Sequence, residues 1–155
     1  MKKVAHFSKA ILAGTGAFIA IGLLSWANSL TSEFVWLMAP FGATAVLVFG
    51  VPDSPLASPK NVIVGHLLCA LIGLLFVTFT DVTPLTLALA SGLAISLMLL
   101  TRTTHPPAGA NPLLIMLTGQ SWWFLLDPVL VGSVCLVVLA QLWFLLKQRW
   151  VPLAE

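Results

Sequence analysis

Charged residues are scarce in this chain of 155 residues. Only 8% are Asp, Glu, Lys or Arg, against about 25% in typical soluble domains. Apolar residues make up 59%, and a soluble fold of this size has too little interior to bury so much apolar surface. The formal net charge of +2 is too small to indicate a nucleic-acid partner. The composition therefore predicts an integral membrane protein in contact with the lipid bilayer.

Cysteine is also scarce, and the expected spans contain no acidic residue. Cys69 and Cys135 both lie inside apolar runs without metal-ligand spacing, which is typical of small buried residues. The three histidines are scattered along the chain. Because an enzyme needs convergent acid–base or metal groups, we predict neither catalysis nor a metal or cofactor site.

Six apolar segments are candidates for membrane spans. Four of them, residues 10–27, 62–79, 85–100 and 128–146, are uninterrupted, whereas the run 34–50 contains Pro40 and Gly42. Three prolines exclude a regular helix over residues 51–60. The sixth segment is split by the stretch 102–111.

The stretch 102–111, R-T-T-H-P-P-A-G-A-N, places ionisable groups between two apolar runs. Such groups are costly at membrane depth, so they usually face a cavity, a pore or a partner. Two consecutive prolines end a helix that enters them, while a new helix starts readily from proline. We therefore predict a broken helix whose N-terminus lies beside Arg102 and His105.

The chain also resembles itself after a shift of 67 residues. Pro40-Phe41-Gly42-Ala43 then falls on Pro107-Ala108-Gly109-Ala110, and Gly65 falls on Gly132 without a gap. We predict one transmembrane domain over residues 1–155 with two internal repeats, about 10–80 and 81–149. Each repeat contains a span, a broken span and a second span.

The topology depends on whether the broken elements cross the membrane. If both cross, the protein is an all-α polytopic membrane protein with six short spans in an inverted 3+3 repeat. The alternative is four spans plus two re-entrant half-helices. The positive-inside rule favours six spans, because all seven basic residues then fall on one side. We expect a bacterial-type inner membrane with both termini in the cytoplasm. Six tryptophans near the expected span ends fit an aromatic belt: Trp26, Trp36, Trp122, Trp123, Trp143 and Trp150.

An inverted repeat would bring two helix N-termini together near the midplane, one at Pro40 and one at Pro107. Each N-terminus offers unpaired N–H groups and a partial positive charge, so the pair predicts a site for a small anion. Gly42 and Gly109 would allow a ligand to approach the backbone. Thr44 and Asn111 occupy equivalent positions one turn into the two helices and are candidate hydrogen-bond donors.

Several candidates have two readings. Arg102 either attracts the anion or anchors the chain at the membrane interface. His105 either binds the anion or a cotransported proton, or caps the broken helix. His66 is either a packed histidine or a proton relay. Asp53 belongs either to the site or to a solvated loop.

The motif T-H-P-P-A-G-A-N at 104–111 resembles the signature of the HPP family of integral membrane proteins. The stretch 39–61, which begins A-P-F-G-A-T-A and contains V-P-D-S-P, is similar to the family's other hallmark, as is G-H-L at 65–67. The resemblance implies a small multi-span protein, described for the family with four spans. Its members have been assigned as transporters, some linked to nitrite. The motif positions carried over are His105, Pro106, Pro107, Gly109, Asn111, Pro40, Gly42, Asp53, Ser54 and Pro55.

Residues and resemblance together predict a membrane transporter for a small inorganic anion, with nitrite as the leading substrate. With six short helices the protomer has little interior, so we expect a homo-oligomer, with a dimer favoured. The first alternative is a passive channel for a small neutral solute, which A-N-P at 110–112 suggests. The second is a membrane subunit that transports nothing.

Overall fold

The computed structural model describes residues 2–30 and 37–150, with side chains over 7–30 and 37–147. Within these residues the chain forms six α-helices and no strand: α1 (Lys2–Ser29), α2 (Ala39–Ala45), α3 (Pro59–Phe79), α4 (Pro84–Leu100), α5 (Asn111–Thr118) and α6 (Val131–Trp150). The predicted all-α fold is confirmed. Trp36, the first residues of the expected 34–50 span and half of the turn at 28–33 lie outside the described residues, as do the side chains of Lys2, Lys3, Arg149 and Trp150.

Short 3₁₀ and π-type segments extend or join these helices: η1 (Val46–Gly50), η2 (Pro55–Ala57), η3 (Pro106–Ala110), η4 (Trp122–Leu125) and η5 (Leu126–Leu130). Three helices are long and apolar enough to cross a membrane, namely Phe7–Ser29, Pro59–Phe79 and Trp122–Lys147. Two shorter apolar helices, Ala39–Gly50 and Pro84–Leu100, accompany them. These lengths and compositions are those of an integral membrane protein.

Proline starts several of the helices. The predicted start at Pro40 is present, whereas α5 begins at Asn111 and not at Pro107. Pro40, Pro59, Pro84 and Pro112 each occupy the first turn of an α-helix, where a missing N–H costs nothing. The predicted break is also present, but the chain resumes after it in the 3₁₀ turn η3 before α5 begins. Likewise, the last long helix is preceded by the π-type segment η5, so its regular part begins at Val131 and not at residue 128.

The end of α4 explains how the chain turns into the break. The N–H of Thr103 donates to the carbonyl of Met98 at 2.9 Å, and that of Arg102 donates to the carbonyl of Leu99 at 3.2 Å. This pair of bonds is the Schellman pattern, which needs a left-handed residue directly after the helix. Arg102 fills that position with φ 54°, although glycine is the usual residue there.

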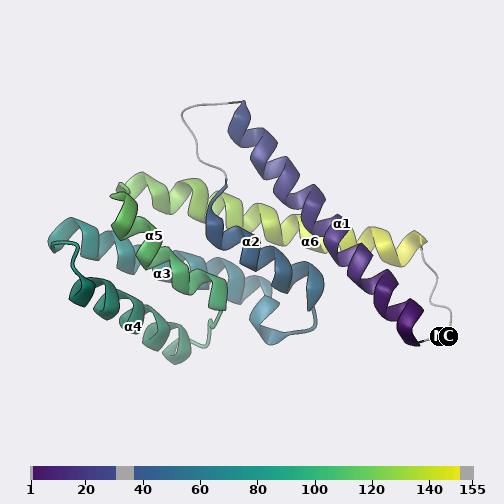
Figure 1. Ribbon diagram of the computed structural model, residues 1–155, viewed down its shortest axis with the longest axis horizontal. Coiled ribbons are helices and arrows are strands. Elements are labelled where there is room, and N and C mark those ends of the chain that lie inside the picture. The colour runs from purple at the N-terminus through teal and green to yellow at the C-terminus, as the bar shows by residue number, and fades with distance from the viewer. Residues whose placement is uncertain (1, 31–36, 151–155) are drawn as a thin grey trace.

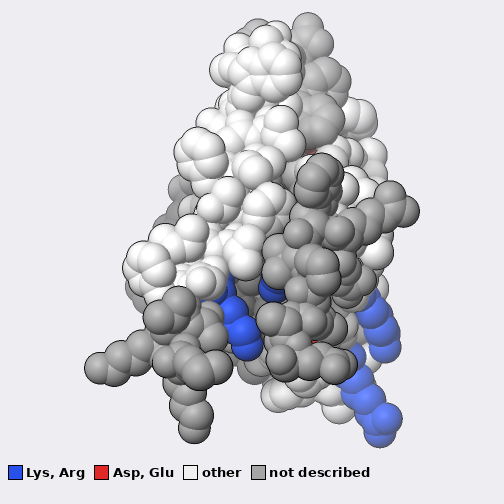
Figure 2. All heavy atoms as spheres, turned by 90° about the vertical axis from the view of Figure 1, so that its right-hand side faces the viewer, with Lys and Arg blue, Asp and Glu red and all other residues white. Residues whose placement is uncertain are grey.

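Figure 1 shows how the helices are arranged: α2 and α5 begin near each other in the middle of the molecule and run in opposite directions. The first residues of α1 and the last residues of α6 lie at the same end (Figure 1). Lys9, Asp53 and Lys147 line one hollow of about 360 Å³ at that end. In the view of this end in Figure 2, Lys and Arg side chains gather in its lower half.

Candidate functional site

Four polar side chains meet inside the bundle: Thr44 from α2, His66 from α3, Asn111 from the start of α5, and His105 from the break before η3. We call these four the polar quartet. Each side chain is 0% exposed. Because an isolated buried polar group is costly, such a group must be held by internal hydrogen bonds.

The hydroxyl of Thr44 joins the two histidines. Its Oγ1 lies 2.8 Å from Nε2 of His66 and 3.0 Å from Nε2 of His105. The amide nitrogen of Asn111 lies 3.1 Å from Nδ1 of His66, and Nδ1 of His105 lies 2.8 Å from the carbonyl oxygen of Leu56. The two imidazole centres are 5.0 Å apart, and Phe41 packs edge-on against His66 at 5.3 Å. The quartet therefore forms one continuous hydrogen-bonded chain.

A glycine on α3 lets the break approach closely enough to place His105 beside His66. A Cβ at Gly65 would lie 2.9 Å from the carbonyl oxygen of Thr103 and 3.0 Å from Cβ of His105. A Cβ essentially never lies as close as 2.9 Å to a backbone oxygen, so any larger residue would push the break away from α3. The G-H pair at residues 65 and 66 thus supplies both the close approach and the imidazole.

Asn61, on the first turn of α3, ties together the two loops that hold His105. Its amide nitrogen donates to the carbonyl of Pro55 at 3.0 Å and to the carbonyl of Thr104 at 3.2 Å. Leu56 follows Pro55 directly, so this link also fixes the carbonyl that His105 contacts. The sequence analysis did not assign Asn61 or Leu56 to the site. The sequence did offer an indication for Asn61, because this polar residue stands between a proline-rich loop and the start of a span. It offers no indication of which backbone carbonyl, such as that of Leu56, will face a site.

The two helix starts predicted to form an anion site line a common pocket of about 670 Å³. We call it the paired-helix pocket; it is lined by Ala39, Pro40, Ala43, Val46, Leu47, Pro106, Pro107, Ala110 and Leu114. Eight of these nine residues form four pairs under the 67-residue shift, with Ala39, Pro40, Ala43 and Leu47 matched by Pro106, Pro107, Ala110 and Leu114. The walls are apolar. The polar quartet is absent from this lining, so helix starts and polar side chains occupy different faces of α2 and α5.

The remaining predicted residues lie outside the quartet. Gly42 and Gly109 have no atom within 4 Å of the position a Cβ would take, so neither is needed for packing. Arg102 is exposed at the end of α4, and Asp53 is exposed in the loop before η2. The structure therefore brings together Thr44, His66, His105 and Asn111, and leaves the two charged candidates at the surface.

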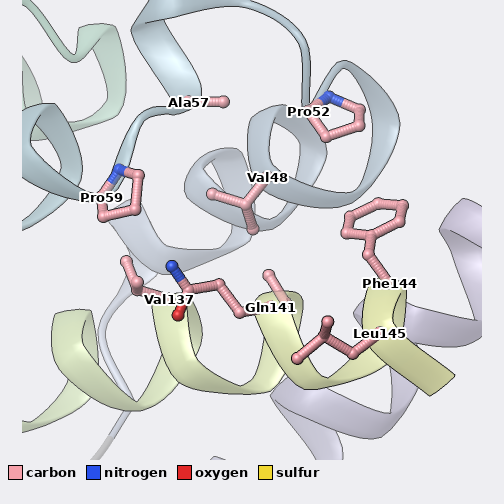
Figure 3. A pocket seen from close by; sticks show the side chains of 9 residues that line it. Val48, Pro52, Ala57, Pro59, Val137, Gln141, Phe144 and Leu145 are labelled. Carbon is pink, nitrogen blue, oxygen red and sulfur yellow. The ribbon is translucent and has the colours of Figure 1, made fainter.

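A second hollow, of about 430 Å³, lies between α6 and the proline-rich loop and is shown in Figure 3. Val48, Pro52, Ala57 and Pro59 face α6 across it, and Gln141 is the only polar side chain that lines it (Figure 3). Its chemistry does not suit an ion.

The two quartet imidazoles are also too few for a metal centre, which usually takes three or more protein ligands. Among the described residues there is no group of three or more His, Cys, Asp or Glu able to hold a metal ion.

Fold and site together define an integral membrane protein of apolar helices with a hydrogen-bonded polar centre. The chain belongs to the HPP family: the family described as "HPP, transmembrane region" matches residues 2–152. The predicted family is therefore confirmed.

Two transmembrane proteins of Dictyostelium discoideum are similar to this chain. One is 35% identical over 137 residues, which is 83% of this chain and 48% of the relative. The other is 34% identical over 130 residues, which is 79% of this chain and 42% of the relative. The chain thus spans about half the length of the curated relatives it matches. No solved structure matches the chain.

Proposed function

We propose that this protein transports a small inorganic anion across the membrane together with a proton. The observation that carries the proposal is the polar quartet, which is fully buried in an apolar bundle. Hydrogen-bonded imidazoles at such depth are costly to maintain, and ionisable groups inside membrane proteins usually serve ion or proton movement. Histidine suits proton movement because its ordinary pKa lies near neutrality. The helix starts at Pro40 in α2 and at Pro107 in η3 add partial positive charge beside a different face of these segments.

Nitrite is the substrate that we propose first. The support for it is the resemblance of the two motifs to the HPP family, some of whose members are linked to nitrite. A proton taken up with each nitrite makes the transport electroneutral, so the membrane potential would not oppose entry. We propose no catalytic reaction, because the clustered ionisable groups of the site are two histidines with neutral hydrogen-bond partners.

The complete burial of the quartet favours a carrier over an open pore. Thr44, His66, His105 and Asn111 are each 0% exposed, so in this conformation the site is closed to water from both sides. A carrier must pass through such a closed state, whereas a passive channel for a neutral solute must keep a continuous wet path. The channel and the non-transporting subunit remain as outcomes of the experiment below.

We propose a bacterial-type inner membrane, with both helix ends near Lys9 and Lys147 in the cytoplasm. The support is the position of Lys9 and Lys147 in one hollow, together with the positive-inside rule. A cysteine replacing Ser121, in a variant lacking Cys69 and Cys135, should then react with an impermeant reagent from outside only.

We also propose a homodimer, because two of the six α-helices have fewer than ten residues. Light scattering in detergent would refute the dimer if it gave the protomer mass.

Nitrite uptake into proteoliposomes tests the function directly. We expect saturable uptake by the wild-type protein that increases as the external pH is lowered, because an inward proton gradient drives it. His105→Ala should abolish this uptake. His105→Asn is the matched variant: its amide nitrogen takes the place of Nδ1 and can still donate to Leu56, but it does not titrate, so its uptake should also be lost. Uptake that neither saturates nor depends on pH would favour the channel, and no uptake of any tested anion or neutral solute would favour the subunit.

A further inference from the structure

The hydrogen bonds of Asn111 fix which nitrogen of His66 carries a proton. The carbonyl oxygen of His66 lies 3.0 Å from the Asn111 side chain, and because a carbonyl only accepts, the amide nitrogen must face it. The same nitrogen lies 3.1 Å from Nδ1 of His66, so Nδ1 is an acceptor. Neutral His66 therefore carries its proton on Nε2, from which it donates to Thr44 Oγ1 at 2.8 Å.

His105 has the opposite arrangement. Its Nδ1 lies 2.8 Å from the carbonyl oxygen of Leu56, so the proton of neutral His105 is on Nδ1. Its Nε2 is then an acceptor, 3.0 Å from Thr44 Oγ1. The carbonyl of Pro40 competes for the single hydroxyl proton of Thr44, but at the longer distance of 3.2 Å. Every bond thus points the same way, from Asn111 through His66, Thr44 and His105 to Leu56.

We infer that Thr44 joins His66 and His105 into a one-way proton relay that this conformation keeps closed at both ends. The inference rests on the proposed function, because it supplies the proton path of the cotransport. At one end the Asn111 amide occupies Nδ1 of His66, where a proton would enter. At the other end the Leu56 carbonyl holds the proton that would leave His105. Movement of α5 and of the proline-rich loop would open these two ends.

The transfer balances with one proton entering and one leaving. After the Asn111 amide moves away, a proton binds Nδ1 of His66 and makes an imidazolium. His66 gives its Nε2 proton to Thr44 as the hydroxyl passes its own proton to Nε2 of His105. His105 then loses its Nδ1 proton to water that replaces the Leu56 carbonyl. Both histidines are left in the opposite tautomer, so the chain must reset before a second proton follows. One proton per transport cycle is the consequence.

Among the side chains that the structure describes, no Asp, Glu, Lys or Arg makes a hydrogen bond to the relay. In the described part of the chain, its hydrogen-bonding neighbours are neutral groups: the amide of Asn111, the hydroxyl of Thr44, and the carbonyls of Pro40, Leu56 and His66. Cys69 lies on the next turn of α3 but packs into a separate apolar cluster with Ile72 and Met116. The two imidazoles are therefore the titratable groups of the relay, and neither is held charged by an ion pair.

Variants of Thr44 test the relay in proteoliposomes in which nitrite uptake and proton uptake are measured in parallel. Wild type should take up one proton for each nitrite. Thr44→Val keeps the shape of the side chain but removes the hydroxyl, and should lower coupled uptake by roughly 100-fold, the scale of a lost proton-transfer group. Thr44→Ser restores the hydroxyl and should restore uptake with the same ratio. Thr118→Val on α5 removes a hydroxyl that bonds only within its helix and with Gln120, and should behave like wild type. Coupled uptake by Thr44→Val at the wild-type level and ratio would overturn the relay.

Nitrogen NMR of the histidine rings tests the relay without relying on transport. In wild-type protein labelled with ¹⁵N on histidine, His66 should be protonated on Nε2 and His105 on Nδ1. In Thr44→Val, the Nε2 signal of His105 should move toward that of an imidazole nitrogen without a hydrogen bond. Identical tautomers on the two residues would overturn the relay even if nitrite is transported. Opposite tautomers with no nitrite flux would instead retain the relay and refute the substrate.

Discussion

The two halves of the chain share a scaffold but differ in chemistry. Under the 67-residue shift, Thr44 and Asn111 take equivalent places on α2 and α5, and both reach the same imidazole. The counterpart of His66 is Ser133, and the counterpart of His105 is Met38. Both counterparts are buried, Ser133 at 0% and Met38 at 5% exposed. Neither half therefore repeats the imidazole that the other half contributes.

This difference indicates what each feature of the repeat does. Matched positions in the two halves line the paired-helix pocket and lie where the two short helical segments start. These structural roles need only the backbone and apolar side chains. The unmatched positions carry the groups that titrate. A symmetric hydrogen-bond chain would have no direction, whereas one imidazole from each half, at unrelated positions, gives a chain with a distinct entrance and exit.

The largest expected difference in unfolding free energy is between variants of His66 and of its counterpart Ser133. His66→Ala removes a buried ring and takes one hydrogen-bond partner from each of Asn111 and Thr44, so we expect a loss of about 3 kcal/mol in unfolding free energy. Ser133→Ala removes a hydroxyl that bonds only the carbonyl of Leu130 at 3.0 Å, and should cost less than about 1 kcal/mol. Thermal unfolding in detergent measures both. Equal losses would show that the two positions have equivalent roles.

A smaller difference in stability is expected between Gly65, which packs closely against the break, and Gly42, which does not. Gly65→Ala places a methyl group against the Thr103 carbonyl and His105, which should cost about 2 kcal/mol of unfolding free energy. Gly42→Ala meets no atom within 4 Å and sits in a helix, where alanine is favoured by up to about 1 kcal/mol. The melting temperature should fall for the first variant and hold or rise for the second.

Nitrite uptake by the same variants tests whether a ligand approaches the backbone at Gly42. Because Gly42→Ala should fold as well as wild type, a drop in its nitrite uptake would show that a ligand approaches the backbone there, as the sequence predicted. A fall in melting temperature for Gly42→Ala would instead mean that this surface is covered in the native assembly.

The smallest effect concerns the ends of α4 and α5, which both finish with a left-handed residue. Gly119 has φ 64° and Arg102 has φ 54°. Arg102→Gly should stabilise the fold by up to about 1 kcal/mol, because glycine takes this conformation without strain. Arg102→Ala keeps a Cβ and should bring no such gain. If Arg102 attracts the anion, both variants should lose uptake to the same degree, which a nitrite concentration series at low salt would show.

The sequence by itself determined the membrane class, the helix start at Pro40 and the position of the break. These follow from local properties: the scarcity of charge, the length of apolar runs, and proline's inability to continue a helix. The motifs at 39–61 and 104–111 also carried the resemblance to the family. The equivalence of Thr44 and Asn111 was visible as a repeat before any contact was known.

Only the tertiary structure decided which polar residues meet. His66 was one of several isolated histidines in the sequence, and its partners lie 22, 39 and 45 positions away along the chain. These residues meet because Gly65 has no side chain and so allows residues 103–105 to pack closely against α3. They also depend on Asn61, which holds the loops at Pro55 and Thr104 together. The direction of the hydrogen-bond chain depends further on two backbone carbonyls, those of His66 and Leu56. Carbonyls are the same at every position of a sequence, so their placement is fixed by packing alone.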